Sequence, residues 1–434
     1  MLPERRTAAR TGLAALQLAP ILVSVVWQAS WVGLLLHSSD PLGRLRHLDW
    51  YAFFQAGHRL LAGDLQALYP RELREEFLWL YPPYCAYVTA PLGLLSEQWA
   101  YIVCCAVQVA SVAGALTFLR AALSAERYVL DVSAVIASSF FNSAVIIGQA
   151  SGFWALILAA SLWSWHGRRA FVTGLLLALM LAKPNWGVVF PAMCLLTRQW
   201  RVLGGIAVGF GVMLLSSLPL GLERWHDFAR TTHAYVDFVE QLTPMSKQLT
   251  MYAFWRTLPG LPHSHGGAIT ALWLASVLPL LAVTVAAWRR RWSEPTPPLP
   301  RLFGLTVLLT IAGNLYVYSY DGLLLLLPAI VWHVQGDQYR SRTCRRLIGG
   351  CVLLVFVFGY VALTYGGVAW IGPLVALWLL GEAYDLLSAA PPVTTSRPAG
   401  SALGFQTWRV RQGALERRLG LAISARLWSR GTAG

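Results

Sequence analysis

Long apolar stretches recur along nearly the whole chain and constrain its fold more than any other feature. They run to 16–25 residues, and the 434-residue sequence is 56% hydrophobic and only 12% charged. A helix needs about 20 apolar residues to cross the hydrocarbon of a bilayer, and it satisfies its backbone hydrogen bonds internally. The sequence therefore predicts an all-α polytopic membrane protein.

Arginine clusters between these stretches predict the topology, because basic residues concentrate in short cytoplasmic loops. The clusters alternate with arginine-poor connections, so we expect both termini in the cytoplasm of a bacterial cell. The first apolar run has no cleavage site and is interpreted as a retained helix. About 12 (11–13) transmembrane helices are predicted, near residues 12–36, 99–120, 129–147, 152–166, 170–182, 185–197, 202–220, 268–289, 301–316, 321–335, 346–364 and 367–388.

One apolar segment, "YPPYCAYVTAPLGLL" at residues 81–95, is too short for this scheme and contains three prolines. If it crossed the membrane, the next arginine clusters would lie on the wrong side, so we expect a re-entrant or interfacial helix on the outer face. The predicted transmembrane domain covers residues 1–390, with large outer loops at 37–98 and 221–267. Residues 391–434 are predicted to form a basic cytoplasmic tail.

Composition and motifs exclude several classes of protein. The net charge of +14 comes from short clusters and not from one basic face, which argues against a nucleic-acid partner. The six cysteines show no CxxC spacing, so neither a zinc site nor a disulfide framework is indicated. There is no Walker motif, no DxD and no Ser-His-Asp order. These absences argue against nucleotide-driven transport and against an enzyme that uses a metal-bound nucleotide sugar.

Five motifs occur in order between residues 10 and 390. They are Asp49 with "WYAFFQAGHRLLAGDLQALYP", then "YPPYCAYVTAPLGLL", "GQASGFWALIL", "GLLLALMLAKPNWGVVFPAMCLL" and "NLYVYSYDGLLLLLPAIV". With these motifs the sequence resembles the polyprenyl-phosphate-sugar-dependent glycosyltransferases of the GT-C superfold, and within it glycosyltransferase family 87, the mannosyltransferase-like group. The resemblance implies a GT-C type bundle.

The resemblance implies that Asp49, in the first outer loop, is the general base. A carboxylate that takes the proton of an acceptor hydroxyl helps that hydroxyl to attack an anomeric carbon. The aromatic residues after Asp49 would partly desolvate it and raise its basicity. The structural alternative is that Asp49 caps the helix that begins at Trp50. Both roles can hold together.

A polyprenyl phosphate leaving group would need cations at the outer face. The candidates for donor phosphate binding are Lys247, Arg256, Lys183 and His233. Lysine and arginine near the end of a span also reach toward the membrane interface without binding a ligand. His263 and His265 share the second large loop with His233, but their spacing does not favour a metal site. Neither a metal nor another cofactor is expected.

Sugar or acceptor contacts are assigned to residues of the outer loops: Trp50, Tyr51, Tyr81, Gln149, Tyr320 and Asp321. Gln149 could equally be part of a polar turn, and Asp321 could simply begin a helix.

The resulting hypothesis is a membrane glycosyltransferase with its active site on the extracytoplasmic face of the bacterial cytoplasmic membrane. It would transfer a sugar, mannose by resemblance, from a polyprenyl-phosphate donor to a lipid-linked or cell-envelope glycan acceptor, with inversion. The main alternative is a transporter or lipid-sugar flippase without covalent chemistry. Transporters tend to place ionisable groups near the bilayer midplane and to contain internal repeats, and neither feature is evident here. An inactive relative acting as a structural subunit is a third alternative.

Overall fold

A computed structural model describes residues 48–69, 79–123, 138–242, 245–261, 266–294, 296–365 and 368–388, with single positions at 26, 30, 46 and 135. The side chains of residues 236–242 and 357–365 are not described. Every described element is helical, apart from one isolated β-bridge between Gln248 and Tyr318. The all-α prediction is confirmed for this part of the chain.

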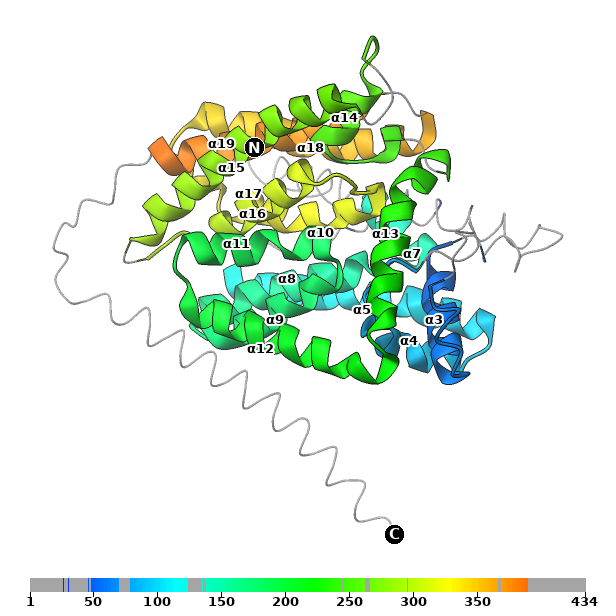
Figure 1. The fold of residues 1–434 in the computed structure, drawn as a ribbon. Helices are drawn as coiled ribbons and strands as arrows, with labels where there is room; N and C mark the ends of the chain where they lie inside the picture. The colour runs from blue at the N-terminus through cyan, green and yellow to red at the C-terminus, as the bar shows by residue number, and fades with distance from the viewer. Residues whose placement is uncertain are drawn as a thin grey trace, which may run out of the picture. The chain divides into compact units, whose positions relative to one another are not determined.

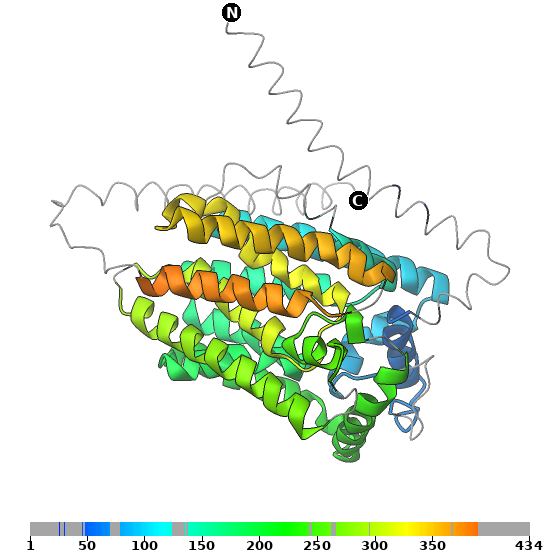
Figure 2. The same ribbon diagram turned by 90° about the horizontal axis from the view of Figure 1, so that it is seen from above.

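Most of the described helices form an antiparallel bundle that runs back and forth (Figure 1). α19 packs against both α15 and α18, and it lies between them in Figure 2. The bundle comprises α8 (Ser151–His166), α9 (Ala170–Leu179), α11 (Val189–Leu196), α12 (Trp200–Ser216), α15 (Gly267–Trp292), α16 (Leu299–Gly313), α17 (Leu326–Val334), α18 (Arg342–Tyr365) and α19 (Ile371–Ser388). Short helical turns join several of them: η1 (Met180–Ala182), α10 (Pro184–Gly187), η2 (Leu218–Leu220), η3 (Met245–Lys247), η4 (Ser319–Leu325) and η5 (Gly336–Gln338).

The remaining helices are α3 (Trp50–Leu61), α4 (Cys85–Gly93), α5 (Glu97–Leu123), α7 (Ser139–Ile147), α13 (Glu223–Leu242) and α14 (Met251–Thr257). α3 packs on α4, and α5 packs on α8. α13 runs across the direction of the bundle helices, close to α3 and α4 (Figure 1). With 9 residues, α4 is about 14 Å long, so it is too short to cross a bilayer by itself.

The number of candidate membrane spans is smaller than predicted. Four described helices are long and apolar enough to cross a membrane, namely α5, the segment 200–220, α15 and α19, or five if the bent pair of α7 and α8 counts as one span. That pair bends by 120°. Four other apolar helices have only 10–17 residues, and a helix of about 15 residues is about 22 Å long. The structure therefore does not show about twelve spans, and the predicted span at 12–36 lies outside the described residues.

The turns of the bundle gather at two ends. We call the turns 148–150, 183–188 and 314–321 the site end, because hydrogen bonds connect them to one another and to Asp49. We call the turns 167–169, 197–199 and 335–341, with the C-terminus of α15, the arginine end. The arginine clusters at 168–169, 198–201, 289–291 and 340–346 all lie in or beside these turns. This separation agrees with the charge pattern from which the topology was predicted.

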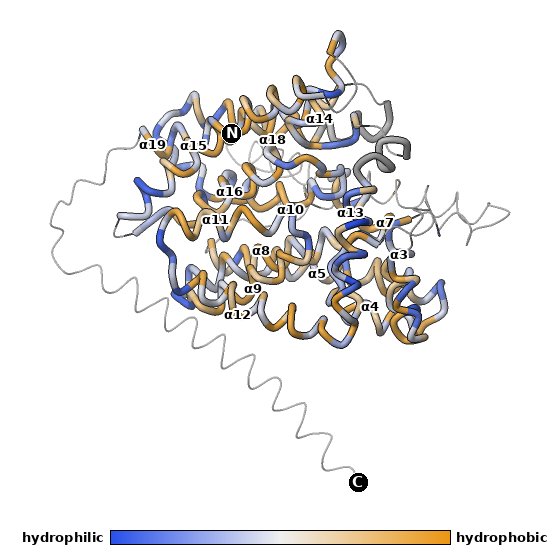
Figure 3. Tube along the Cα trace, viewed as in Figure 1, coloured by the Kyte–Doolittle hydropathy of each residue, from blue (hydrophilic) through white to orange (hydrophobic). Residues whose placement is uncertain are grey.

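Side-chain chemistry differs along the bundle in the same way. Figure 3 shows apolar colour along the bundle helices and hydrophilic colour at many turns and on α13. Leu215 and Leu353 are exposed on bundle helices, as lipid-facing side chains are.

At the arginine end, Arg301 is buried and forms salt bridges with Glu382 and Asp385, both at 2.9 Å. The two carboxylates neutralise the Arg301 guanidinium, whose charge would otherwise be costly to bury.

Two glycines of the run 204–211, Gly205 and Gly209, face α9 closely. A Cβ atom on Gly205 of α12 would lie 2.1 Å from the carbonyl oxygen of Phe171 on α9. A Cβ on the facing Gly174 would lie 2.0 Å from the carbonyl oxygen of Val202. Gly205 and Gly174 let α9 and α12 approach closely, whereas a Cβ on Gly204 would meet nothing within 4 Å.

Candidate active site

Asp49 precedes α3 and points its carboxylate at the turn between α7 and α8. Its Oδ2 accepts a hydrogen bond from Nε2 of Gln149 at 2.6 Å. The Asp49 side chain makes no capping bond to α3, and its backbone is helical (φ −62°, ψ −26°), whereas a capping residue is usually extended. The carboxylate is therefore held by a residue 100 positions away in the chain, and capping does not explain its position.

Gln149 is fixed by further contacts on its amide. Its Oε1 accepts from the hydroxyl of Tyr81 at 3.1 Å and from the backbone N–H of Ala150 at 2.9 Å. Both ends of the amide are thus engaged with the protein, and the residue is 7% exposed. This arrangement favours a role in positioning Asp49 over the sugar contact that the sequence predicted.

The turn itself depends on Gly148, which has a left-handed backbone (φ +68°). A Cβ atom there would lie 2.5 Å from Cβ of Trp50. Trp50 is fully buried under this turn, with its ring 5.4 Å from that of Tyr101. Trp50, which sequence reasoning assigned to sugar or acceptor contacts, has no exposed surface in this structure.

A second carboxylate, Asp321 in η4, is paired with Lys183. Nζ of Lys183 lies 2.8 Å from Oδ2 of Asp321, and the hydroxyl of Ser151 donates to Oδ1 at 2.8 Å. Asp321 is 1% exposed and follows Tyr318, the residue at the N-cap of η4, by three positions. It therefore lies in the first turn of that helix, but it is not the capping residue. Lys183 also lies 4.4 Å from the ring centroid of Trp186.

Both carboxylates are thus held from one short segment, with Gln149 bonding Asp49 and Ser151 bonding Asp321. Sequence reasoning singled out Gln149 and missed Ser151, although the polar residues alternate in "GQASG". The segment lies at the bend between α7 and α8, so the break in the helix aims the two side chains into the site.

Tyrosines surround the carboxylates. Tyr320 places its hydroxyl beside Asp49, and its ring centroid lies 5.7 Å from that of Tyr318. Tyr235 of α13, which sequence reasoning missed, lies next to Tyr318 and close to both aspartates. Burial, together with the charges of Asp49 and Asp321, raises the pKa of Tyr318 to about 12. These phenols therefore stay protonated at neutral pH and can donate hydrogen bonds.

Burial also raises the pKa of Asp49 above its ordinary value. The hydrogen bond from Gln149 and the positive charge of Lys183 act in the opposite direction, while the negative charge of Asp321 adds to the effect of burial. A carboxylate with a raised pKa is a stronger base than an exposed one, which suits it to accept a proton from a hydroxyl.

The first-loop aromatics form a wall beside Gln149. Tyr81 packs on Phe53 and Trp79, with ring centroids 5.3 and 5.2 Å away. Tyr51 is partly buried, and its hydroxyl accepts a hydrogen bond from Gln55.

The other three residues predicted to bind the donor phosphate differ in how deeply they are buried. Lys247 is partly buried and precedes Gln248, whose β-bridge reaches Tyr318. Arg256 is buried in α14, 5.9 Å from the ring centroid of Tyr252. His233 is exposed on α13.

No group of three metal-binding side chains occurs within the described residues, and His263 and His265 lie outside them.

Comparison with known proteins identifies the family. The model of glycosyltransferase family 87 matches residues 79–312, which is more than half of the chain. The matched region contains Gln149, Lys183, Lys247 and Arg256, whereas Asp49 precedes it and Asp321 follows it. No curated protein matches the sequence significantly. Membership of such a family implies an enzyme that transfers a sugar from a donor to an acceptor. The chain belongs to glycosyltransferase family 87.

Proposed function

We propose that the protein transfers a sugar, mannose by its resemblance, from a polyprenyl-phosphate donor to a lipid-linked or cell-envelope glycan acceptor. The observation that carries this proposal is the bond from Gln149 to Asp49, beside the ion pair of Lys183 and Asp321. A positioned base and buried counter-charges are what a glycosyl transfer without a metal needs.

Asp49 is the proposed base. Its Oδ2 is held by Gln149, and the hydroxyl of Tyr320 lies beside the same carboxylate. The carboxylate would take the proton of the acceptor hydroxyl as the hydroxyl attacks the anomeric carbon and the bond from that carbon to the polyprenyl phosphate breaks. With a β-linked donor, direct displacement inverts that carbon and gives an α-linked product.

Phosphate binding requires more positive charge than the central ion pair supplies. Two aspartates and one lysine leave the centre with a net charge of −1 when all three are ionised. A phosphate monoester would be repelled unless further cations compensate. Lys247 and Arg256 supply that charge in our proposal, and Lys183 mainly holds Asp321. His233, being exposed on α13, is the weakest of the predicted contacts.

The remaining polar groups would bind the sugar and the acceptor. Tyr51, Tyr81 and Tyr320 carry hydroxyls next to the carboxylates or on the aromatic wall, and such rings pack well on the apolar faces of a sugar. Asp321 would act through Lys183 and Ser151, which occupy both of its oxygens.

The proposed location is the bacterial cytoplasmic membrane, with the site end on the extracytoplasmic face. The gathering of arginines at the opposite end supports this orientation. Partners are then membrane lipids, the lipid donor and the acceptor glycan.

The test uses the full-length protein in nanodiscs with radiolabelled polyprenyl-phosphate-mannose and total membrane lipid and glycan extract. We expect transfer by the wild type and a loss of at least about 100-fold in Asp49→Asn, because removing a general base costs about 10² to 10⁴ in rate. Asp64→Asn is the matched control. Asp64 lies in the same loop and is exposed, and it accepts a hydrogen bond from the nearby backbone N–H of Ala67.

Equal transfer by wild type and Asp49→Asn would contradict the role of Asp49 while keeping the enzyme. If the folded wild type transfers nothing but moves a fluorescent polyprenyl-phosphate sugar between leaflets of a vesicle, the flippase alternative is correct.

A further inference from the structure

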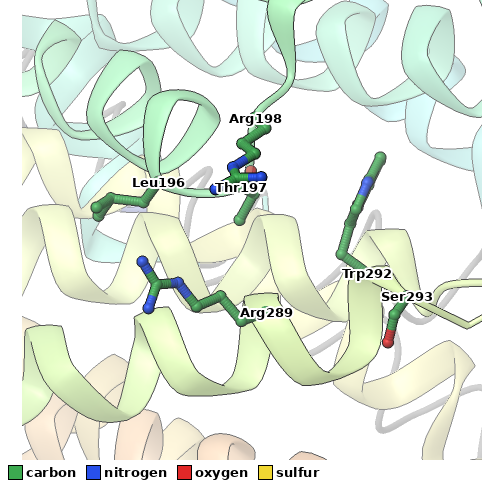
Figure 4. A pocket seen from close by; sticks show the side chains of 6 residues that line it. All are labelled: Leu196, Thr197, Arg198, Arg289, Trp292 and Ser293. Atoms are coloured by element: carbon green, nitrogen blue, oxygen red, sulfur yellow. The ribbon is translucent and has the colours of Figure 1, made fainter.

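A cavity of about 390 Å³ opens at the arginine end, between the turn after α11 and the C-terminus of α15 (Figure 4). It lies at the opposite end of the bundle helices from Asp49, so it is separate from the proposed active site. The lining residues are Leu196, Thr197, Arg198, Arg289, Trp292 and Ser293.

Two guanidinium groups from different helices give this cavity its charge. Arg198 and Arg289 are both exposed, and neither forms an ion pair with any residue that the structure describes. Figure 4 shows both side chains at the rim of the same space. A guanidinium presents paired N–H donors that match the oxygens of a phosphate. The cavity therefore fits an anion of this kind.

The backbone at Arg198 has a left-handed conformation (φ +59°), which glycine adopts more easily than arginine does. Arg198 follows the last residue of α11 by two positions, and its N–H bonds the carbonyl oxygen of Leu195. The turn thereby places the side chain across from Arg289.

Apolar side chains surround the cationic cavity. Trp292 and Leu196 line it, while Leu195 and Trp200 are 56% and 64% exposed on the adjoining helices. An inorganic anion gains nothing from these groups. A molecule with a phosphate and hydrocarbon chains can satisfy the arginines and cover the apolar side chains together.

We propose that this cavity binds the phosphate of an anionic phospholipid head group, with the acyl chains along α11 and α12. A free phosphate shares the chemistry that the arginines recognise, and the exposed apolar residues favour the lipid. The site would fix the arginine end at the surface of an anionic leaflet.

The test measures lipid retention by native mass spectrometry of the full-length protein in detergent, titrated with phosphatidylglycerol or phosphatidylcholine. We expect a preference for phosphatidylglycerol. Each of Arg198→Gln and Arg289→Gln should weaken its binding about fivefold, and the double variant about 25-fold, in line with the usual contribution of one basic side chain at an anionic surface. Arg290→Gln is the control, because Arg290 is exposed on the same helix end and does not line the cavity.

Several results would overturn the proposal. One is equal affinity for phosphatidylglycerol in the wild type and in the folded double variant. Another is an effect of Arg290→Gln as large as that of Arg289→Gln, which would indicate only general surface attraction. Binding of inorganic pyrophosphate that depends on Arg198 and Arg289, without selectivity between lipids, would show a site for a soluble anion.

Arg289→Lys should keep part of the preference for phosphatidylglycerol, since lysine retains the positive charge but lacks the paired N–H donors of the guanidinium.

Discussion

Two carboxylates lie in one site but in different surroundings. Both oxygens of Asp321 are occupied, by Lys183 and Ser151, and the side chain is closed to solvent. Asp49 is only partly buried, and its hydrogen bonds come from neutral groups, the amide of Gln149 and the hydroxyl of Tyr320. Such differences assign different roles to similar groups. Asp49 is available to accept a proton, whereas Asp321 is committed to holding Lys183.

Replacing Gln149 by methionine should move the acid limb of the pH–rate profile to higher pH. The Gln149 N–H favours the ionised form of Asp49, so its loss raises the pKa of Asp49 further. Because the base acts only when it is deprotonated, activity would then begin to fall at a higher pH as the solution is acidified. We also expect kcat at neutral pH to drop about tenfold or more, as the carboxylate loses its orientation. The measurement is sugar transfer by both proteins between about pH 5 and 9.

Gln55→Met is the control for that profile, since the Gln55 amide bonds Tyr51 and not Asp49. Gln149→Glu should shift the acid limb in the same direction as methionine, because it removes the donor and adds a negative charge. A lower rate with an unmoved acid limb would mean that Gln149 only supports the fold of its turn.

Sequence reasoning located the polar residues of the site but not their partners. Asp49, Lys183 and Asp321 were each placed at an outer loop or span end from charge and hydropathy, and the structure brings those segments together. The bond between Asp49 and Gln149 spans 100 positions of the chain, which no local pattern encodes. The burial of Trp50 is a second feature that the sequence does not encode locally. An aromatic residue directly after a loop carboxylate suggests a surface on which a sugar could pack, but the tertiary structure shows that Trp50 is fully buried.

At the scale of helices, apolar composition was a better guide to fold class than to the number of spans. Each apolar run was interpreted as one span, including runs such as 170–182 and 185–197 that are shorter than the roughly 20 residues a crossing needs. The predicted spans 170–182 and 185–197 correspond to the apolar helical segments Ala170–Ala182 and Pro184–Leu196, which are divided at Lys183 and are each shorter than one crossing needs. Proline prevents a helix from continuing, because it lacks an N–H and restricts the preceding residue.

The contact between α9 and α12 gives a prediction about stability. Gly205→Ala should lower the free energy of unfolding by about 1–3 kcal/mol, since its Cβ would overlap the carbonyl of Phe171 and neither backbone can move freely. Gly204→Ala is the matched control on the adjacent residue. A Cβ there meets nothing, so it should be neutral or stabilise by up to about 1 kcal/mol through helix propensity. Thermal unfolding in detergent at one scan rate compares the two, and equal midpoints would contradict the close contact.

On the scale of the whole molecule, the residues of the candidate active site and the arginine clusters lie at opposite ends of the bundle. The carboxylates and tyrosines lie at the site end, while Arg301 with its acidic partners and the exposed arginines lie at the arginine end. Basic loops tend to stay in the cytoplasm during membrane insertion, so we expect the arginine end to face the cytoplasm and the site end to face the opposite side. The same asymmetry separates the proposed lipid-phosphate cavity from Asp49 and Asp321 of the candidate site.

This orientation can be measured with a membrane-impermeant maleimide on intact cells. The six native cysteines give little background, because five are buried and Cys105 is only partly exposed. Asp64→Cys, in the first outer loop, should react in intact cells, whereas Thr343→Cys, exposed at the arginine end, should react only after the membrane is permeabilised. Labelling of both positions in intact cells would show that the two ends are not on opposite sides of the membrane. Labelling of Thr343→Cys alone would place Asp49 in the cytoplasm, where the proposed extracytoplasmic transfer could not occur.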